Sequence, residues 1–202
     1  MISGKFTTTT SVLQVLVWNG HEARVYYWPD NMADCEPQQQ SKFQSKSQSM
    51  ALRHETIFRA LNNVVELCNL RGIVRQKITF SESEGSPKHL DVNGDYLAVA
   101  TDTGLIKIFQ VTRREPKQLG SPGHFNIWAQ ARDQLVSGMP PINDRYTSPR
   151  IPNHTEKATN CHVIRTIRCN ANGTCVSILA DHVRREQNCT IFLVCSLFKC
   201  KL

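Results

Sequence analysis

Three groups of residues in this chain have types and spacings that could support chemistry. Six of the eight cysteines lie after residue 160, and thiolates beside a histidine are common ligands of structural zinc. His54-Glu55 begins like the His-Glu-x-x-His motif of a metalloprotease, and residues 81–85 place two glutamates close together. Each group must therefore be compared with the spacing that its chemistry requires.

The late cysteines favour packing over metal binding. No pair among them has the Cys-x-x-Cys spacing that directs two thiolates to one tetrahedral zinc; they are Cys161, Cys169, Cys175, Cys189, Cys195 and Cys200. His162 adjoins Cys161, but adjacent side chains of a strand point to opposite faces. We expect free thiols that act as small hydrophobic residues within strands, and no metal site.

The two remaining groups do not complete a catalytic or cation-binding motif. His54-Glu55 lacks the second histidine, and residues 81–85 lack the alternating Asp/Asn ligands of a calcium loop. The chain also contains no glycine-rich phosphate loop and no Gly-x-Ser-x-Gly elbow. We expect residues 81–85 to form a solvated turn, and we predict no catalytic residue, no cofactor and no enzymatic activity.

The net charge of +7 leaves two interpretations open. A basic chain can bind nucleic acid or an acidic membrane surface. The densest basic groups are only pairs, and none forms the block of five to eight residues that typifies a nucleic-acid patch; they are Arg113-Arg114, Arg184-Arg185, and Lys199 with Lys201. A solvated surface is therefore the favoured interpretation, and a basic nucleic-acid-binding module is the alternative.

Four aromatic residues near the amino terminus could in principle stack on bases. They are Trp18, Tyr26, Tyr27 and Trp28. Base-stacking platforms interleave aromatic with basic residues, whereas Arg24 is the only basic residue close to this group. We expect these aromatic residues to pack in the core and between sheets.

Residues 90–111 predict the type of element that positions these side chains. Two apolar segments, 96–100 and 105–111, flank the turn Asp102-Thr103-Gly104, and the turn Asn93-Gly94 precedes the first segment. These turn residues tolerate positive φ, and the flanking residues are β-branched or aromatic. The pattern is typical of the middle of a β-propeller blade and predicts an all-β fold.

Three further segments predict strands. Residues 12–28 form two apolar runs around Asn19-Gly20, and the Asn172-Gly173 turn lies within residues 162–179. Residues 57–80 fit either a helix or two strands, and their β-branched content favours strands. The two Asn-Gly turns at residues 93 and 172 lie 79 residues apart. Because blades span ~40 to 45 residues, this interval fits two blades, or one blade with an insertion.

The connecting segments complete the predicted organisation. We expect a partial blade at 1–28, a polar linker or insertion at 29–50, blades at 51–115, a Pro-rich insertion at 116–160, a blade at 161–181 and a divergent tail at 182–202. The amino terminus lacks the apolar core of a signal peptide. The most apolar run, 191–198, is far shorter than the ~20 residues that span a bilayer, so no transmembrane segment is predicted.

Residues 72–115 resemble the intraflagellar transport protein 140 family, whose members are subunits of complex A of ciliary transport trains. The most specific motifs are Phe-Ser-Glu-Ser-Glu-Gly at 80–85, Leu-Asp-Val-Asn-Gly at 90–94, and Arg-Arg-Glu at 113–115. Residues 17–20 and 167–179 resemble an earlier and a later stretch of the same propeller. The resemblance covers about two-thirds of the chain and is to later blades of the family's second amino-terminal WD-repeat propeller.

The resemblance implies a fold and a function. The fold would be a partial WD-repeat β-propeller of about three to four blades, because the family's first propeller and helical repeat array have no counterpart here. The function would be that of a non-catalytic scaffold supporting retrograde ciliary transport and cilium assembly, located in the cilium and cytoplasm, at the ciliary base and axoneme. The partners would be other complex A subunits and ciliary membrane-protein cargo adaptors, with no small-molecule substrate and no nucleic acid.

Overall fold

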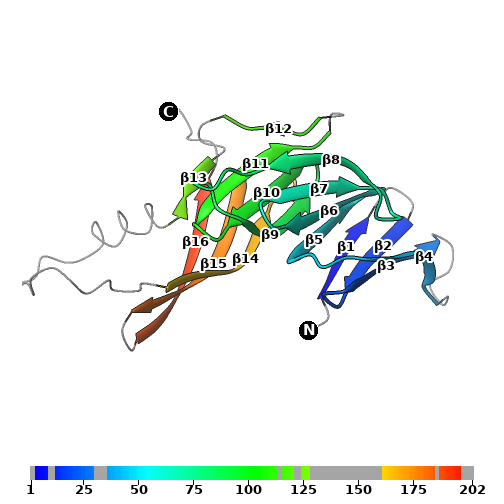
Figure 1. The fold of residues 1–202 in the computed structure, drawn as a ribbon, viewed down its shortest axis with the longest axis horizontal. Coiled ribbons are helices and arrows are strands. Elements are labelled where there is room, and N and C mark those ends of the chain that lie inside the picture. Colours follow the sequence, from blue (N-terminus) through cyan, green and yellow to red (C-terminus); the bar gives the residue numbers. More distant parts are fainter. Residues whose placement is uncertain are drawn as a thin grey trace, which may run out of the picture.

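The described residues form four antiparallel sheets that follow one another in chain order (Figure 1). The computed structural model describes residues 3–8, 12–29, 36–112, 115–120, 124–127, 161–184 and 187–196. Nearly all regular structure in these ranges is β-strand. Within each sheet the strands pair with their sequence neighbours, except that β13 pairs with β11, so each sheet is a meander of the kind that forms a propeller blade.

We name the sheets blades A to D. Blade A contains β1 (Ser3–Thr8), β2 (Val12–Trp18), β3 (Glu22–Pro29) and β4 (Gln38–Gln44). Blade B contains β5 (Ser49–Arg53), β6 (Thr56–Leu61), β7 (Val64–Cys68) and β8 (Val74–Thr79). Blade C contains β9 (Pro87–Asn93), β10 (Tyr96–Thr101), β11 (Leu105–Gln110), β12 (Lys117–Gln118) and β13 (His124–Asn126). Blade D contains β14 (Cys161–Cys169), β15 (Cys175–Arg184) and β16 (Gln187–Ser196).

The predicted hairpins are confirmed. Strands β10 and β11 pair from Tyr96↔Gln110 to Ala100↔Ile106, on either side of the predicted turn. Gly94 and Gly104 have φ values of 53° and 81°, the left-handed conformation for which the Asn-Gly and Asp-x-Gly signals select. The segment that fitted either a helix or strands forms β6, β7 and β8.

The helical spacing of residues 57–68 has a simple origin. Ile57 and Cys68 pack against blade A, whereas Phe58, Ala60 and Val65 pack against blade C. A strand buried on both faces is apolar at nearly every position. Such a run contains apolar residues three and four apart without being a helix.

Two segments differ from the organisation predicted for them. Residues 38–44, expected within a polar linker, form β4, the outermost strand of blade A. Its side chains are exposed or half-buried, because an outer strand contributes backbone hydrogen bonds and needs little apolar surface. Residues 187–196, expected within a divergent tail, form β16, which pairs with β15. Most of the predicted Pro-rich insertion lies outside the described residues.

Three apolar cores join consecutive blades. Leu16, Trp18 and Val25 of blade A pack against Met50 and Ile57 of blade B. The next core unites blades B and C through Phe58, Phe80, Leu97, Val99 and Phe109. The third unites blades C and D through Ala98, Ile106, Ile108, Ile167 and Ile178. Each middle blade is therefore buried on both faces, as propeller blades are.

The blades form an open partial ring. The first strands of successive blades contact one another in the order β1, β5, β9 and β14, and so line the inner side of the arc. Blades C and D share a core, so the two Asn-Gly turns lie on neighbouring blades. One face of blade A and one face of blade D have no other described blade packed against them (Figure 1).

Candidate interaction surfaces

The blades have two ends, which differ in the elements they carry. Because the strands are antiparallel, the β5–β6, β9–β10 and β14–β15 turns all lie at one end, which we call the turn face. The opposite end carries the β6–β7 and β10–β11 turns and the connector of residues 80–86, and we call it the loop face.

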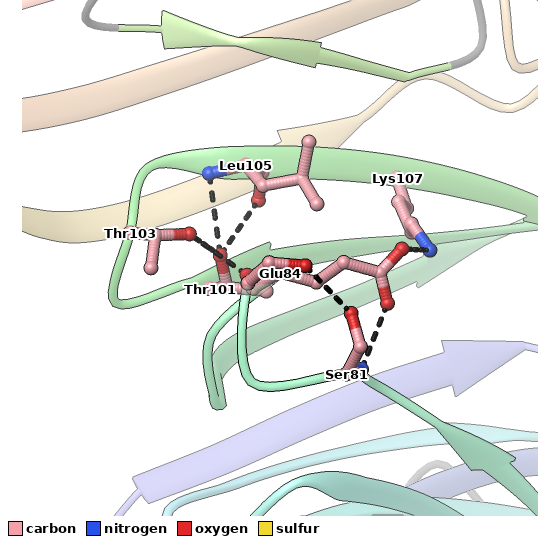
Figure 2. Close-up of polar contacts among 7 residues, drawn as sticks. Ser81, Glu84, Thr101, Thr103, Leu105 and Lys107 are labelled. Carbon is pink, nitrogen blue, oxygen red and sulfur yellow. Dashed lines mark hydrogen bonds and ion pairs between the residues drawn. The ribbon is translucent and has the colours of Figure 1, made fainter.

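The connector of the loop face is held by an ion pair between blades B and C (Figure 2). Glu84 accepts a hydrogen bond from the Ser81 backbone N–H at 3.0 Å and forms a short ion pair with Lys107 of β11. The Lys107 side chain is buried, and its Nζ lies 5.1 Å from the centre of the Phe80 ring. Residues 81–85 are thus a turn, as predicted, in which one of the two glutamates has an internal partner.

Further hydrogen bonds join this connector to the β10–β11 turn. The Thr103 hydroxyl donates to the Glu84 carbonyl at 2.7 Å, and the Ser86 N–H donates to Asp102 Oδ1 at 2.8 Å. Within the turn, the Leu105 N–H donates to Thr101 Oγ1 at 3.2 Å (Figure 2). Partners supplied by the chain satisfy these groups, so the cluster holds the connector against the β10–β11 turn.

The Glu84–Lys107 pair predicts an acid-sensitive component of stability. Hydrogen bonding from Lys107, followed by that from the Ser81 backbone, lowers the pKa of Glu84 from its ordinary value of 4.5. A carboxyl with a lowered folded-state pKa stabilises the fold above its unfolded pKa and loses this contribution as pH falls through the folded value. We therefore expect Lys107→Met to lower the unfolding midpoint at pH 7 by several degrees, and by progressively less as the pH falls below the ordinary carboxyl pKa of 4.5.

Thermal unfolding over a series of pH values, in a Leu13→Lys, Val194→Lys background that keeps the open ring monomeric, measures this difference. The control is Lys88→Met, since Lys88 lies 3.8 Å from Asp102 and its side chain is 36% exposed, so its ion pair contributes little. A loss for Lys107→Met that stays the same from neutral to strongly acidic pH would contradict the assigned role of the pair.

The turn face is joined from blade to blade by polar contacts. Arg53 donates through Nε to the Gly94 carbonyl at 2.5 Å, and its Nη2 lies 2.6 Å from Asp95 Oδ1. Asn93 donates to the Cys169 carbonyl at 3.0 Å, and Asp91 accepts from the Cys169 N–H at 2.9 Å. These contacts hold the turns of blades B, C and D in fixed relative positions.

The cysteines and aromatic residues occupy packing positions where the structure describes them. Cys68 and Cys169 are buried and free, and burial raises the pKa of the Cys169 thiol to about 12. The described residues contain no group of three or more His, Cys, Asp or Glu side chains that could hold a metal ion.

The predicted aromatic group divides between two faces of blade A, since Trp18 packs against blade B and Tyr26 lies on the opposite face.

Most basic side chains of the described blades are paired with carboxylates. Two shared pairings are Arg59 and Lys77 with Glu66, and Arg24 and Lys42 with Glu22. Hydrogen bonds from these cations keep the pKa of Glu22 below its ordinary value. Such pairing spreads the positive charge over several blades, which does not favour a nucleic-acid groove.

Two hollows remain open to a ligand at the junctions between blades. One, of about 650 Å³, opens at the turn face between blades B and C, with Arg53, Arg75 and Val111 among its lining residues. The other, of about 370 Å³, lies where β9 and β14 begin at the loop face, beside Lys88 and His89. Burial lowers the pKa of His89. Neither hollow coincides with a residue group that the sequence marks as a candidate site.

The comparison with known families identifies the propeller. A model of the IFT140 second β-propeller family matches residues 3–137, which is more than half of the chain. The chain belongs to this family. The match to the IFT140 second β-propeller includes blades A, B and C, whereas blade D lies after its last residue.

Solved structures also resemble the chain, and one of them is a crystal structure titled HIRA(644-1017), with 10% identity and a TM-score of 0.40. The alignment covers 95% of this chain and 52% of that one, so the chain spans about half the length of the structure it matches. In the part of the chain that the structure describes, no helix has the length and hydropathy that a bilayer-spanning segment needs.

Proposed function

We propose that this IFT140-family propeller is a non-catalytic scaffold element of the intraflagellar transport complex A, and that it supports retrograde ciliary transport and cilium assembly. The family match over three consecutive blades is the observation that carries this proposal. The site of action is the cilium and the cytoplasm at the ciliary base, and the partners are other complex A subunits and cargo adaptors.

The proposed mechanism is the display of rigid surfaces. Inter-blade contacts such as Arg53 with Asp95 and Asn93 with Cys169 hold neighbouring turns in place. A surface that is ordered before binding loses little conformational entropy when a partner docks. Several such contacts on one polypeptide raise the avidity of a large assembly without any single tight interface.

The absence of catalysis is part of the proposal and has structural support. The polar cluster of Figure 2 is satisfied internally, since Glu84 and Lys107 pair with each other and Thr103 donates to a backbone carbonyl. A catalytic acid or base must reach a substrate proton. Glu84, engaged with Lys107 and the Ser81 N–H, is instead committed to holding a loop.

Affinity purification from ciliated cells tests the proposed function. We expect a protein tagged at its own locus to co-purify with the other complex A subunits after washing at physiological salt, at levels well above those of an unrelated tagged propeller. Recovery of the tagged protein in folded form without any complex A subunit would contradict the proposal.

A further inference from the structure

The hollow at the turn face between blades B and C has the features of a peptide-binding cleft. It measures about 650 Å³, a volume typical of ligand sites. Phe58, Leu67 and Val111 form its apolar part, and each is less than one-tenth exposed. Arg53, Arg75 and Gln76 add polar groups to the same cleft. An apolar floor beside polar donors suits a segment that carries both kinds of side chain.

A β-bulge explains why β8 contributes two polar residues to this cleft. The pairing of β7 with β8 shifts register between Leu67↔Gln76 and Cys68↔Val74, which leaves Arg75 as the extra residue. A bulge interrupts the alternation of side chains and can redirect one of them. Here the consecutive residues Arg75 and Gln76 both line the cleft.

The two arginines give the cleft a preference for anions. Arg53 is 20% exposed at its side chain and is oriented by the Gly94 carbonyl and Asp95, so it retains further N–H donors. Arg75 has no carboxylate partner among the described residues, unlike most basic side chains of these blades. Among the described residues that line the cleft none is acidic, and the acidic neighbour of Arg53 is Asp95. A guanidinium binds a carboxylate with two parallel hydrogen bonds.

We propose that this cleft binds an acidic peptide segment of a partner protein, with a carboxylate against Arg75 and Arg53 and a neighbouring apolar side chain over Phe58 and Val111. This inference rests on the proposed scaffold function and specifies the chemistry of one partner. The two guanidinium groups supply orientation and most of the affinity, and the small exposed parts of Phe58 and Val111 add an apolar contact.

Site-specific crosslinking tests the proposal in the intact assembly. Gln76, replaced by p-benzoylphenylalanine at the protein's own locus, places a photoreactive group within the cleft. We expect mass spectrometry to identify a crosslinked partner peptide that carries Asp or Glu within a few residues of the attachment point. Adding Arg75→Ala should lower the crosslink yield about tenfold, because a hydrogen bond between charged groups contributes about that factor.

Arg71→Ala provides the matched control. Arg71 is exposed in the β7–β8 turn and does not line the cleft, so this variant removes the same charge nearby and should retain the crosslink. A crosslink to RNA, to a segment without acidic residues, or one unaffected by Arg75→Ala would overturn the inference. The inference would also be overturned if no crosslink formed while complex A subunits still co-purified. If the unsubstituted protein failed to co-purify with those subunits, the proposed function itself would be contradicted.

Discussion

The 202-residue chain, expressed by itself, is expected to elute as large oligomers or aggregate rather than as a 22.9 kDa monomer. Three cores bury the sides of the four blades that face one another, which leaves one face of blade A and one face of blade D uncovered. A closed propeller ring has no such uncovered faces. Leu13 of blade A lies on the face opposite Leu16 and is 36% exposed. Val194 of blade D pairs with Ser177, away from the blade C core, and is 62% exposed.

Substitutions on these two end faces should restore monomer. Burying one valine or leucine contributes about 1.5 to 3 kcal/mol, so losing one contact weakens association about 10- to 150-fold. We expect Leu13→Lys combined with Val194→Lys to raise the monomeric share strongly in size-exclusion chromatography with light scattering. Ile73→Lys is the control, since Ile73 is 60% exposed in the β7–β8 turn and not on an end face.

A monodisperse monomer that unfolds cooperatively, obtained from the unsubstituted chain, would contradict the open-ring structure. If Ile73→Lys raised the monomeric share equally, general surface hydropathy, and not the two uncovered blade faces, would be the cause of the association.

Gly94→Ala should be among the most destabilising single substitutions in the described blades. Gly94 has φ 53°, and a Cβ at this position would overlap the backbone carbonyl oxygen of Ala171 in blade D. An L-residue in this conformation costs about 1–2 kcal/mol, and the carbonyl can yield only if the β14–β15 turn moves. We expect a total loss of about 3 kcal/mol, or about 6 to 12 °C in unfolding midpoint for a chain of this size.

Gly20→Ala separates the two contributions. Gly20 also has positive φ, at 95°, but a Cβ there would meet no atom within 4 Å. It should therefore show the conformational cost alone, about 1–2 kcal/mol. Differential scanning fluorimetry of both variants in the Leu13→Lys, Val194→Lys background gives the comparison. Equal losses for the two glycines would show that the close approach of blades C and D is not required for stability.

The strands were largely predictable because their signals are local. Asn93-Gly94 and Asp102-Thr103-Gly104 specify turns by their tolerance of positive φ, and the runs between them bury both faces. One of the two exceptions, β4, is an outer strand whose polar side chains face solvent, so its sequence lacks the apolar pattern that identifies inner strands.

The candidate cleft could not be predicted in the same way. Nothing in the local sequence distinguishes Arg75 from other exposed strand residues. Only the register shift opposite Leu67 places it beside Gln76 in the cleft. Its relation to Arg53 depends on how blades B and C pack, which is a contact between segments distant in sequence. The glutamates of residues 81–85 were visible as a cluster, whereas the buried Lys107 that pairs with Glu84 lies 23 residues away.

The most direct test of the scaffold function is quantitative co-purification of complex A subunits with the Gly94→Ala and Gly20→Ala variants, tagged at their own locus in ciliated cells. If ordered blades hold the complex, Gly94→Ala should lower subunit recovery per tagged molecule several-fold, while Gly20→Ala should stay close to the unsubstituted protein. Unchanged recovery with Gly94→Ala, despite a confirmed loss of propeller stability, would contradict a scaffold role for these blades.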